Sequence, residues 1–372
     1  MNKPLITFAL IAHNHEQFIK EAVKGAFAQT YSPLEIILSD DHSSDETLHI
    51  MRNLAATYKG PHLVVINANE ANLGTAPAHV NRIMELAKGE LIVIASGDDI
   101  SIAERTQITY YAWEQSSRQA AMIHSRVIAV NERGEIIKGF HDYQGASRNS
   151  IYSKERLSLE RYVRDLPVIY GCTCAWSPRV FSTFGPLPNG LVQEDCAIAL
   201  RALAIGPIVF IDRPLVKYRL HSNNICFYVK RRLTDLESFD RHENRSKRVL
   251  GWNLILYKTF FSDLRMASEK GLLRTEECEP AMREIERKYK IDAFKLEMYG
   301  ASFLRKFVLL FKLSQLGIHI RYLKQLAYRL IPYPIYRKAK VGTERWREMH
   351  SSYKKGFLSS VVFKSIRNKF GK

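Results

Sequence analysis

The chain has few cysteines for its 372 residues: there are five, an odd number, scattered along the sequence. No two of them have the C-x-x-C spacing of a zinc site, and Cys172-x-Cys174 is a weak metal signal when it stands alone. A disulfide scaffold is not indicated either, so we interpret the thiols as reduced and mostly buried in a cytoplasmic protein. The five are Cys172, Cys174, Cys196, Cys226 and Cys278.

Long apolar runs and glycine-rich phosphate loops are also missing. No uninterrupted apolar run reaches the length that a membrane-spanning helix needs. The apolar run within MNKPLITFALIAHNH is followed by no small-residue cleavage site, so a first strand fits it better than a signal peptide. Neither G-x-G-x-x-G nor G-x-x-x-x-G-K-[ST] occurs, which leaves a dinucleotide fingerprint and a P-loop unsupported.

Acidic residues are nearly absent from the end of the chain. Residues 303–372 hold 17 of the 55 Lys and Arg residues and two of the 38 acids, Glu344 and Glu348, a net charge of +15. The other 302 residues hold 38 basic and 36 acidic residues, a net charge of +2. The excess of +17 is therefore a property of the tail, which favours an anionic surface as its partner.

Apolar runs and helical patterns alternate strictly through the first hundred residues. This alternation predicts an α/β fold with a mostly parallel sheet flanked by helices. One of the helices is expected to begin at the capping box Ser43-Ser-Asp-Glu46. From residue 233 the pattern is mostly helical, so we place a domain boundary near residue 230. The expected strands cover residues 5–12, 34–38, 63–66 and 91–95, and the expected helices cover 16–29, 43–58 and 75–89.

Polar residues follow each of these four predicted strands. The carboxyl ends of parallel strands meet at one edge of a sheet, where ligands bind in such folds. The four sets of side chains are therefore expected to converge on one site. They are His13, Asn14 and His15 after the first strand, Asp40, Asp41 and His42 after the second, Asn72 and Gly74 after the third, and Asp98 and Asp99 after the fourth.

The stretch ELIVIASGDD places two adjacent carboxylates, Asp98 and Asp99, directly after a buried strand. Two like charges repel each other and are costly to desolvate unless something neutralises them. A hard divalent cation such as Mg²⁺ or Mn²⁺ prefers oxygen ligands and can bridge a carboxylate and a diphosphate. A solvated turn at a capped strand end is the alternative interpretation.

Four motifs, in order, resemble those of family 2 glycosyltransferases with the GT-A fold. They are LIAHNHEQFIKEAVKGAFAQTYSPLEIILSDDHSSDET, NLGTAPAHVNRIMELAKGELIVIASGDD, QEDCAIALRA and YRLHSNN. The resemblance covers about residues 4–226 and implies a catalytic domain over residues 1–230, followed by a helical, basic region over 231–372. It implies transfer of a sugar from a nucleotide-sugar donor, with UDP the likeliest carrier, to a saccharide acceptor.

The resemblance also implies roles for the polar residues at the sheet edge. Asp98 aligns with the last acid of the family's D-x-D metal site, Asp99 is a second ligand or a ribose contact, and His221 reaches the metal or the diphosphate. Asp40 is favoured over Asp41 as the group that accepts the uracil N–H. The other donor-binding residues expected on this basis are Ala12, His13, Asn14, Asn72, Gly74 and Asn81.

Glu194-Asp195 resembles the family's catalytic acid pair. An acceptor hydroxyl is a poor nucleophile at neutral pH, so a nearby carboxylate should take its proton as it attacks. By resemblance Asp195 is this base and Glu194 orients the acceptor. The alternative is a helix start, where acids are favoured electrostatically. Gly171 and Trp176 match the wall on the acceptor side, although a core Trp is about as common there.

Two departures from the family pattern keep rival functions open. Ser96 stands where the commoner D-x-D motif has an acid, and Val80 stands where an Arg often precedes Asn81. One rival is a catalytically degenerate GT-A domain that serves as a membrane-docked assembly subunit. The other is a nucleotidyltransferase, which would normally show a glycine-rich loop after the first strand.

The segment FLRKFVLLFKLSQLGIHIRYLKQLAYRLI, residues 303–331, alternates apolar and basic residues and contains no acid. This composition fits an interfacial helix on anionic lipid, and lipid-linked saccharides at the cytoplasmic membrane face are acceptors of many relatives. The alternative is a helical bundle that packs on the catalytic domain or forms a homodimer. No nucleic-acid-binding module is visible, so nucleic acid is not expected as a partner.

Overall fold

The structure is a computed structural model, and it describes residues 3–140, 157–221, 224, 236–316, 330, 335, 338 and 341. The chain divides into two compact units, Met1–Phe227 with Ile255–Lys288, and Tyr228–Leu254 with Tyr289–Lys372. Cys226 and most of the basic tail after residue 316 lie outside the described residues. None of the four described cysteines forms a disulfide bond.

The first unit contains a mostly parallel sheet, as the alternating pattern predicts. Its described strands lie in the order β3-β2-β1-β4-β7-β6-β8-β5, with β1 parallel to β2 and β4, and β6 parallel to β8. The pairs of β7 and the pair β5–β8 are antiparallel. The strands are β1 Ile6–Ala12, β2 Leu34–Asp40, β3 Leu63–Ala68, β4 Leu91–Ser96, β5 Ile100–Ser101, β6 Met122–Val130, β7 Ala175–Trp176 and β8 Ile208–Arg219.

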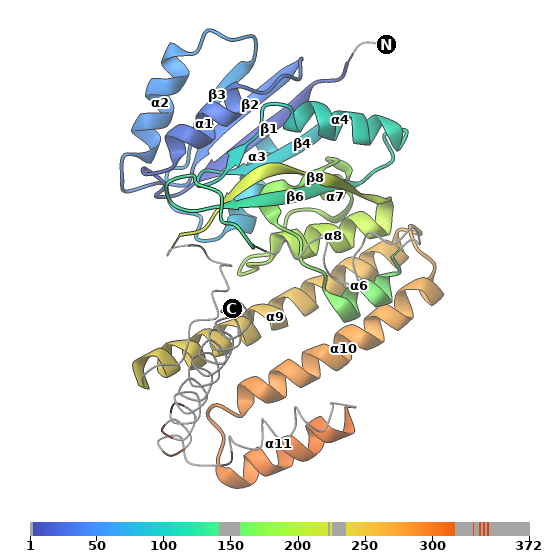
Figure 1. Ribbon diagram of the computed structural model, residues 1–372. Helices are drawn as coiled ribbons and strands as arrows, with labels where there is room; N and C mark the ends of the chain where they lie inside the picture. The colour runs from blue at the N-terminus through green and yellow to red at the C-terminus, as the bar shows by residue number, and fades with distance from the viewer. Residues whose placement is uncertain are drawn as a thin grey trace, which may run out of the picture. The chain divides into compact units, whose positions relative to one another are not determined.

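Helices cover both faces of this sheet (Figure 1). Side chains of α1, α2 and α4 form one core with alternate residues of β1, β2 and β4, including Phe8, Ile36 and Val93. Asn81 and Met84 of α3 bond to groups near α7 and β7. The helices of this part are α1 Ile19–Phe27, α2 Thr47–Thr57, α3 Ala76–Leu86, α4 Arg105–Gln115, α6 Leu159–Asp165, α7 Arg179–Phe184 and α8 Glu194–Ile205, with the 3-10 turn η1 Gly171–Thr173.

The expected capping box is wrong. The residue that precedes α2 is Glu46, with no side-chain cap, and the Ser43 hydroxyl donates instead to Asp40. The pattern S-x-x-E describes a spacing only, and here the nearby buried carboxylate at the end of β2 accepts the hydrogen bond of the Ser43 hydroxyl. By contrast, the expected start of α3 is confirmed, because the Thr75 side chain accepts the Ala78 N–H.

The expected helical extension is confirmed by α9 Leu236–Glu269, α10 Thr275–Glu297 and α11 Phe303–Gln315. The end of α9 and the start of α10 belong to the first unit, although they follow the boundary predicted near residue 230. In the second unit, Leu309 and Leu313 of α11 are buried with Met298. Among the described helices, none is both long and apolar enough to cross a bilayer.

A buried ion pair attaches α9 to α8 within the first unit. The Arg201 guanidinium donates to both carboxylate oxygens of Asp263, over 2.8 and 3.1 Å, and to the Gly185 carbonyl over 2.8 Å. Arg201 and Asp263 are 2% and 4% exposed. Residues after the predicted boundary therefore help to hold the helix that begins at Glu194.

Candidate functional site

The loops that follow β1 and β2 are joined by hydrogen bonds at the carboxyl edge of the sheet. The Asn14 N–H donates to Ser43 Oγ over 2.9 Å. The Asp41 N–H donates to the Ala12 carbonyl over 2.9 Å, and His13 Nδ1 lies 2.9 Å from the Asp41 carbonyl oxygen. The structure thus brings together the expected donor-binding residues of the first two loops.

Asp40 is the residue favoured for contact with the nucleotide base, and it is fully buried at the end of β2. Its Oδ2 accepts the Ser43 N–H over 2.9 Å, and its Oδ1 accepts the Ser43 hydroxyl over 2.5 Å. Each oxygen of a carboxylate has a second lone pair available for a ligand. The contacts show Asp40 holding the turn after β2, and its role toward a base stays a prediction.

Asp41 lies at the end of a buried chain of polar side chains. Its Oδ1 accepts the Asn69 amide over 2.8 Å, and Asn67 donates both to Asn69 and to Ser39 Oγ, over 2.9 Å each. Ser39 Oγ lies 2.6 Å from His79 Nε2. Burial lowers the pKa of His79 to about 4, so this ring is neutral at pH 7. The network fixes Asp41 in position.

The loop after β3 meets the same edge. Asn72 Nδ2 lies 3.1 Å from a ring nitrogen of His13 and donates to the Asp41 carbonyl over 3.3 Å. The Gly74 N–H donates to Asn72 Oδ1 over 2.6 Å. Asn72 and Gly74, both predicted to bind the donor, therefore bond to each other, and Asn72 also contacts the loops that follow β1 and β2.

Asp98, in the turn after β4, is held between two histidines. Its Oδ2 lies 3.1 Å from His221 Nε2 and 3.9 Å from His15 Nε2. Burial raises the pKa of Asp98, but the hydrogen bond with His221 and the nearby His15 outweigh it, so the pKa lies below its ordinary value. The Phe18 ring packs on His221 with 4.9 Å between the ring centroids. Asp98 and His221, two predicted metal ligands, are thus in contact.

Asp99 has different partners from those of a metal ligand. Its Oδ1 accepts the backbone N–H of Arg219 over 2.8 Å, the Cys172 thiol bonds to it as well, and it is 5% exposed. Burial and the Asp98 charge hold the pKa of Asp99 well above its ordinary value. Asp99 therefore ties β8 to the turn after β4, and these contacts give no support to its expected place in the metal site.

Arg219, at the end of β8, is fully buried. Its guanidinium donates to the Asp98 carbonyl over 2.9 Å, to the Glu132 carbonyl over 2.8 Å and to Glu21 Oε2 over 2.9 Å. It is two residues from His221. Arg219 thus fixes the backbone of Asp98 and the strand that carries His221.

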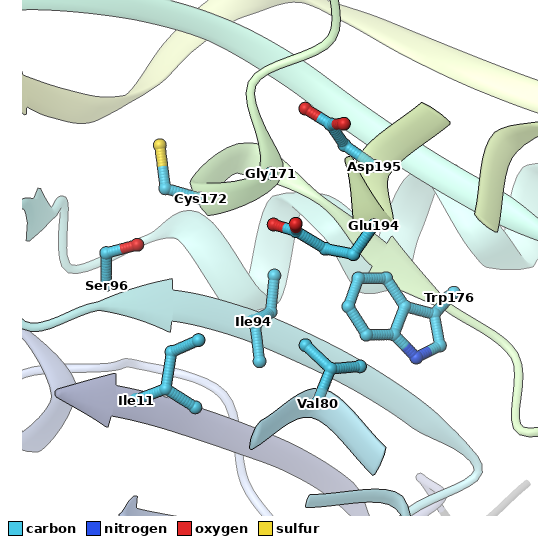
Figure 2. A pocket seen from close by; sticks show the side chains of 9 residues that line it. All are labelled: Ile11, Val80, Ile94, Ser96, Gly171, Cys172, Trp176, Glu194 and Asp195. Atoms are coloured by element: carbon cyan, nitrogen blue, oxygen red, sulfur yellow. The ribbon is translucent and has the colours of Figure 1, made fainter. Parts of the chain in front are cut away.

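The predicted acid pair opens α8 and lines a pocket (Figure 2). Figure 2 shows the carboxylates of Glu194 and Asp195 pointing in different directions from the first turn of the helix. Burial and the Asp195 charge raise the pKa of Glu194 to about 8, and burial raises that of Asp195 to about 6. The pair therefore binds protons at higher pH than ordinary carboxyl groups do, and Asp195 is the more easily ionised of the two.

The absence of a side chain at Gly171 makes room for the carboxylate of Glu194. A Cβ added at Gly171 would lie 2.9 Å from Glu194 Oε1, closer than real Cβ contacts come. Ser96, the residue in place of the family acid, lines the same pocket as Glu194 and Asp195. The full lining is Ile11, Val80, Ile94, Ser96, Gly171, Cys172, Trp176, Glu194 and Asp195.

Two predicted site residues have mainly structural contacts. The Asn81 amide group donates to the Leu187 carbonyl over 2.9 Å and accepts the Leu187 N–H over 2.8 Å. Trp176 is 1% exposed, and its indole N–H lies 3.3 Å from Met84 Sδ. Asn81 thus holds the turn before α8, and Trp176 forms a buried part of the pocket wall.

Asp98 and His221 are the predicted ligands that fit a divalent cation. A carboxylate and an imidazole are ligands that Mn²⁺ accepts, and their facing atoms are 3.1 Å apart. Within the described part of the chain, no group of three or more His, Cys, Asp or Glu side chains is arranged so that it could hold a metal ion. The protein groups therefore leave room for other ligands in the coordination sphere.

Comparison with known proteins agrees with this geometry. The sequence model described as Glycosyl transferase family 2 matches residues 7–176. This part of the chain belongs to glycosyltransferase family 2. The match ends at Trp176, so it includes the strand-end loops and Asp98 but not Glu194, Asp195 or His221.

Individual relatives extend the similarity beyond that match. An uncharacterized glycosyltransferase of Rickettsia prowazekii is 22% identical over 287 residues, which cover 76% of this chain and 85% of the relative. One of Methanocaldococcus jannaschii is 25% identical over 163 residues, 43% of this chain and 54% of the relative. Residues 1–349 of S. aureus TarS, solved with UDP, superpose with a TM-score of 0.52 at 15% identity. The superposition covers 94% of this chain and 91% of that TarS fragment. Residues 7–176 are therefore a family 2 glycosyltransferase domain, and the fold of the described residues is the expected GT-A fold.

Proposed function

We propose that this glycosyltransferase is inverting and transfers a sugar from a UDP-sugar to a hydroxyl group of a saccharide acceptor. The observation that carries the proposal is the position of the adjacent carboxylates of Glu194 and Asp195 in the pocket that Ser96 also lines. Ser96 is two residues from Asp98, which contacts His221. The pocket thus extends from the proposed proton acceptor, Asp195, to Ser96 at the end of β4, near the candidate metal ligand Asp98. That TarS was solved with UDP supports the choice of carrier.

In the proposed reaction, Asp195 takes the proton of the acceptor hydroxyl as its oxygen attacks the anomeric carbon of the donor sugar. The new C–O bond forms on the side opposite the diphosphate, and the bond to the diphosphate oxygen breaks with its electron pair. Glu194, protonated at pH 7, can donate a hydrogen bond to another oxygen of the acceptor. The products are the inverted glycoside, a protonated Asp195 and the nucleoside diphosphate.

Asp98 and His221 would hold a divalent cation, Mn²⁺ or Mg²⁺, at the diphosphate. When bound, such a cation stabilises the charge that develops on the leaving group. His221 Nε2 faces Asp98 Oδ2, and the ring is held by Phe18. Both side chains are therefore already oriented toward one point, which limits the reorganisation that binding requires.

Calorimetry with UDP, GDP and dTDP, each with and without Mn²⁺, tests the donor and the metal together. We expect binding of UDP that is strengthened by Mn²⁺, and we expect Asp98→Ala to remove the effect of the metal. Asp195→Ala should abolish transfer while leaving UDP binding largely intact. Normal transfer by Asp195→Ala would reject the assignment of the base, and equal binding with and without Mn²⁺ would reject the metal.

Two further assays, of pyrophosphate release and of membrane binding, separate the two rivals. A nucleotidyltransferase would release pyrophosphate from a nucleoside triphosphate. A degenerate assembly subunit would bind membranes but transfer no sugar from any donor. Ser96 and Val80 are the departures that favour the second rival, and both line the pocket with Glu194.

We further propose that the basic region attaches the enzyme to an anionic membrane surface, where lipid-linked saccharides would be its acceptors. In α11, Phe303, Phe307 and Phe311 recur every fourth residue and are 61%, 62% and 61% exposed. The helix contains Arg305, Lys306 and Lys312 and no acid. An exposed apolar stripe beside cations is the composition of a helix that lies in the headgroup region. This supports a location on the cytoplasmic face of the cell membrane.

Sedimentation of the full chain with vesicles tests the membrane proposal. We expect binding to vesicles that contain phosphatidylglycerol, weakened by salt, and Phe307→Asp should reduce it about tenfold or more, because burial of a Phe side chain contributes about 1.5–3 kcal/mol. Tyr111→Asp on α4 is the matched control, since Tyr111 is 55% exposed. Equal vesicle binding by Phe307→Asp would reject this surface, and a stable dimer that Phe307→Asp dissociates would assign the stripe to a second copy.

A further inference from the structure

One side of the pocket that Glu194 and Asp195 line is apolar. Figure 2 shows the side chains of Ile11, Val80 and Ile94 gathered together beneath the Glu194 carboxylate. They come from three different elements, β1, α3 and β4. None of these side chains has a hydrogen-bonding group, so this side of the pocket can contact a ligand only through hydrocarbon.

Two polar side chains of the lining are already bonded to other residues. The indole N–H of Trp176 lies 3.3 Å from Met84 Sδ. The Cys172 thiol bonds to Asp99. Neither group needs a partner from a ligand. The other polar side chains of the lining are Ser96, Glu194 and Asp195.

The two departures from the family pattern, Val80 and Ser96, both line this pocket. The resemblance implies an arginine and an acid at these positions, and this chain has a charge at neither. Burial also raises the pKa of Glu194 to about 8, as expected for a carboxyl group with little access to water. The pocket is therefore suited to an uncharged ligand that has one apolar part.

The apolar side is held in place by hydrogen bonds of α3. Asn81, the residue after Val80, donates to the Leu187 carbonyl over 2.9 Å and accepts the Leu187 N–H over 2.8 Å. Val80 is 1% exposed and Ile94 is 4% exposed. The position of this side of the pocket is thus fixed before a ligand binds, which favours selection among ligands by their shape and polarity.

The donor sugar is the part of the substrates that this pocket would hold. In an inverting transfer, the base and the leaving group lie on opposite sides of the anomeric carbon. Asp195 lies in the pocket, and so does Ser96, which is two residues from Asp98 and the proposed diphosphate site. The sugar ring that joins the reacting carbon to the diphosphate therefore lies between these residues, beside the apolar side chains.

We propose that the donor sugar carries a methyl group, as a 2-acetamido sugar or a 6-deoxy sugar does, and that Ile11, Val80 and Ile94 contact this group. The inference rests on the proposed function, because it requires the base at Asp195 and the diphosphate near Asp98. A hydroxyl group in the same place would lose its hydrogen bonds to water and find no partner among these side chains. A methyl group would be stabilised by leaving water.

Calorimetry with UDP, UDP-glucose, UDP-N-acetylglucosamine and UDP-6-deoxyglucose tests this inference without an acceptor. The last two compounds each differ from UDP-glucose at one ring substituent, which carries or becomes a methyl group. We expect one of them to bind about fourfold or more tightly than UDP-glucose, and the tighter one identifies which kind of methyl group the pocket takes. Val80→Thr keeps the shape of the side chain but places a hydroxyl group against the methyl group. It should bring the affinities for this donor and UDP-glucose close to each other while leaving the affinity for UDP unchanged.

Val168→Thr is the matched control, because Val168 is 47% exposed and is not part of the lining. It should leave the preference of the wild type unchanged. Equal affinities of the wild type for the three UDP-sugars, with UDP itself bound, would overturn the inference and leave the proposed function standing. A preference that Val80→Thr does not alter would also overturn it, since the methyl group would then lie elsewhere. Absence of binding of UDP and of all three UDP-sugars would overturn both.

Discussion

Replacing Glu194 with glutamine should stabilise the protein in a manner that depends on pH. The folded-state pKa of Glu194 is about 8, against an ordinary value of 4.5. Below pH 4.5 the carboxyl is protonated in both folded and unfolded chains, so its burial has no charge penalty. As the pH rises from 4.5 toward 8, the unfolded chain loses this proton while the folded chain keeps it, and stability declines.

Each pKa unit corresponds to about 1.4 kcal/mol, so the 2.5 units between 4.5 and pH 7 give about 3 kcal/mol. This is an upper limit, because Glu194 is partly exposed and shares its shift with Asp195. Glutamine keeps the shape of the side chain without its charge. Glu194→Gln should therefore unfold at higher urea concentration than the wild type, with a larger difference at pH 7 than at pH 5.

Urea unfolding of both chains at several pH values measures this difference, and Glu70→Gln provides the control. Glu70 is exposed, so its substitution should give a small difference that does not change with pH. If Glu194→Gln changes the urea midpoint of unfolding by the same amount at pH 5 and at pH 7, the carboxyl group of Glu194 is not desolvated. The proposed proton on Glu194 at neutral pH would then be wrong.

Three further outcomes follow from the same contacts. The rate of sugar transfer should fall as the pH is lowered through about 6, because Asp195 must be ionised to accept a proton; a pH profile of the rate measures this, and a flat profile would reject it. Asp263→Ala should destabilise the chain by about 3–5 kcal/mol in urea unfolding, since it leaves Arg201 buried without its counter-ion, and a loss under 1 kcal/mol would contradict this. Arg219→Met should weaken Mn²⁺-dependent UDP binding measured by calorimetry, because Arg219 holds the Asp98 carbonyl. Glu21→Gln, which changes only the half-exposed partner of Arg219, should have little effect. Equal effects of the two substitutions would reject a positioning role for Arg219.

The first half of the fold could be predicted because its pattern is local. Strands β1, β2 and β4 are buried, so they appear in the sequence as continuous apolar runs. The second half of the sheet could not be predicted in this way. Strands β5 and β7 have two residues each, and β8 continues through a Pro and charged residues beside β6. Such strands depend on their neighbours rather than on their own composition.

The strand-end rule located the donor loops and Asp98, because the ends of adjacent parallel strands must lie side by side. The positions of Glu194 and Asp195 required the resemblance to a family, since they come from a helix that no strand-end argument reaches. His15 was expected at the sheet edge with the other polar residues that follow β1, and the structure places its ring near Asp98.

The sequence does not distinguish a polar side chain that binds a ligand from one that forms hydrogen bonds with the backbone. Asn81 and Asp99 were both predicted to bind the donor or its metal, and both bond to backbone groups, of Leu187 and Arg219, that are 106 and 120 residues distant. An Asn or Asp near a ligand edge has the same local sequence in either role. The difference is whether a distant segment supplies a buried N–H or carbonyl group that must be paired. Only the three-dimensional structure supplies that information, and here it reduces the candidate metal ligands to the side chains around Asp98 Oδ2.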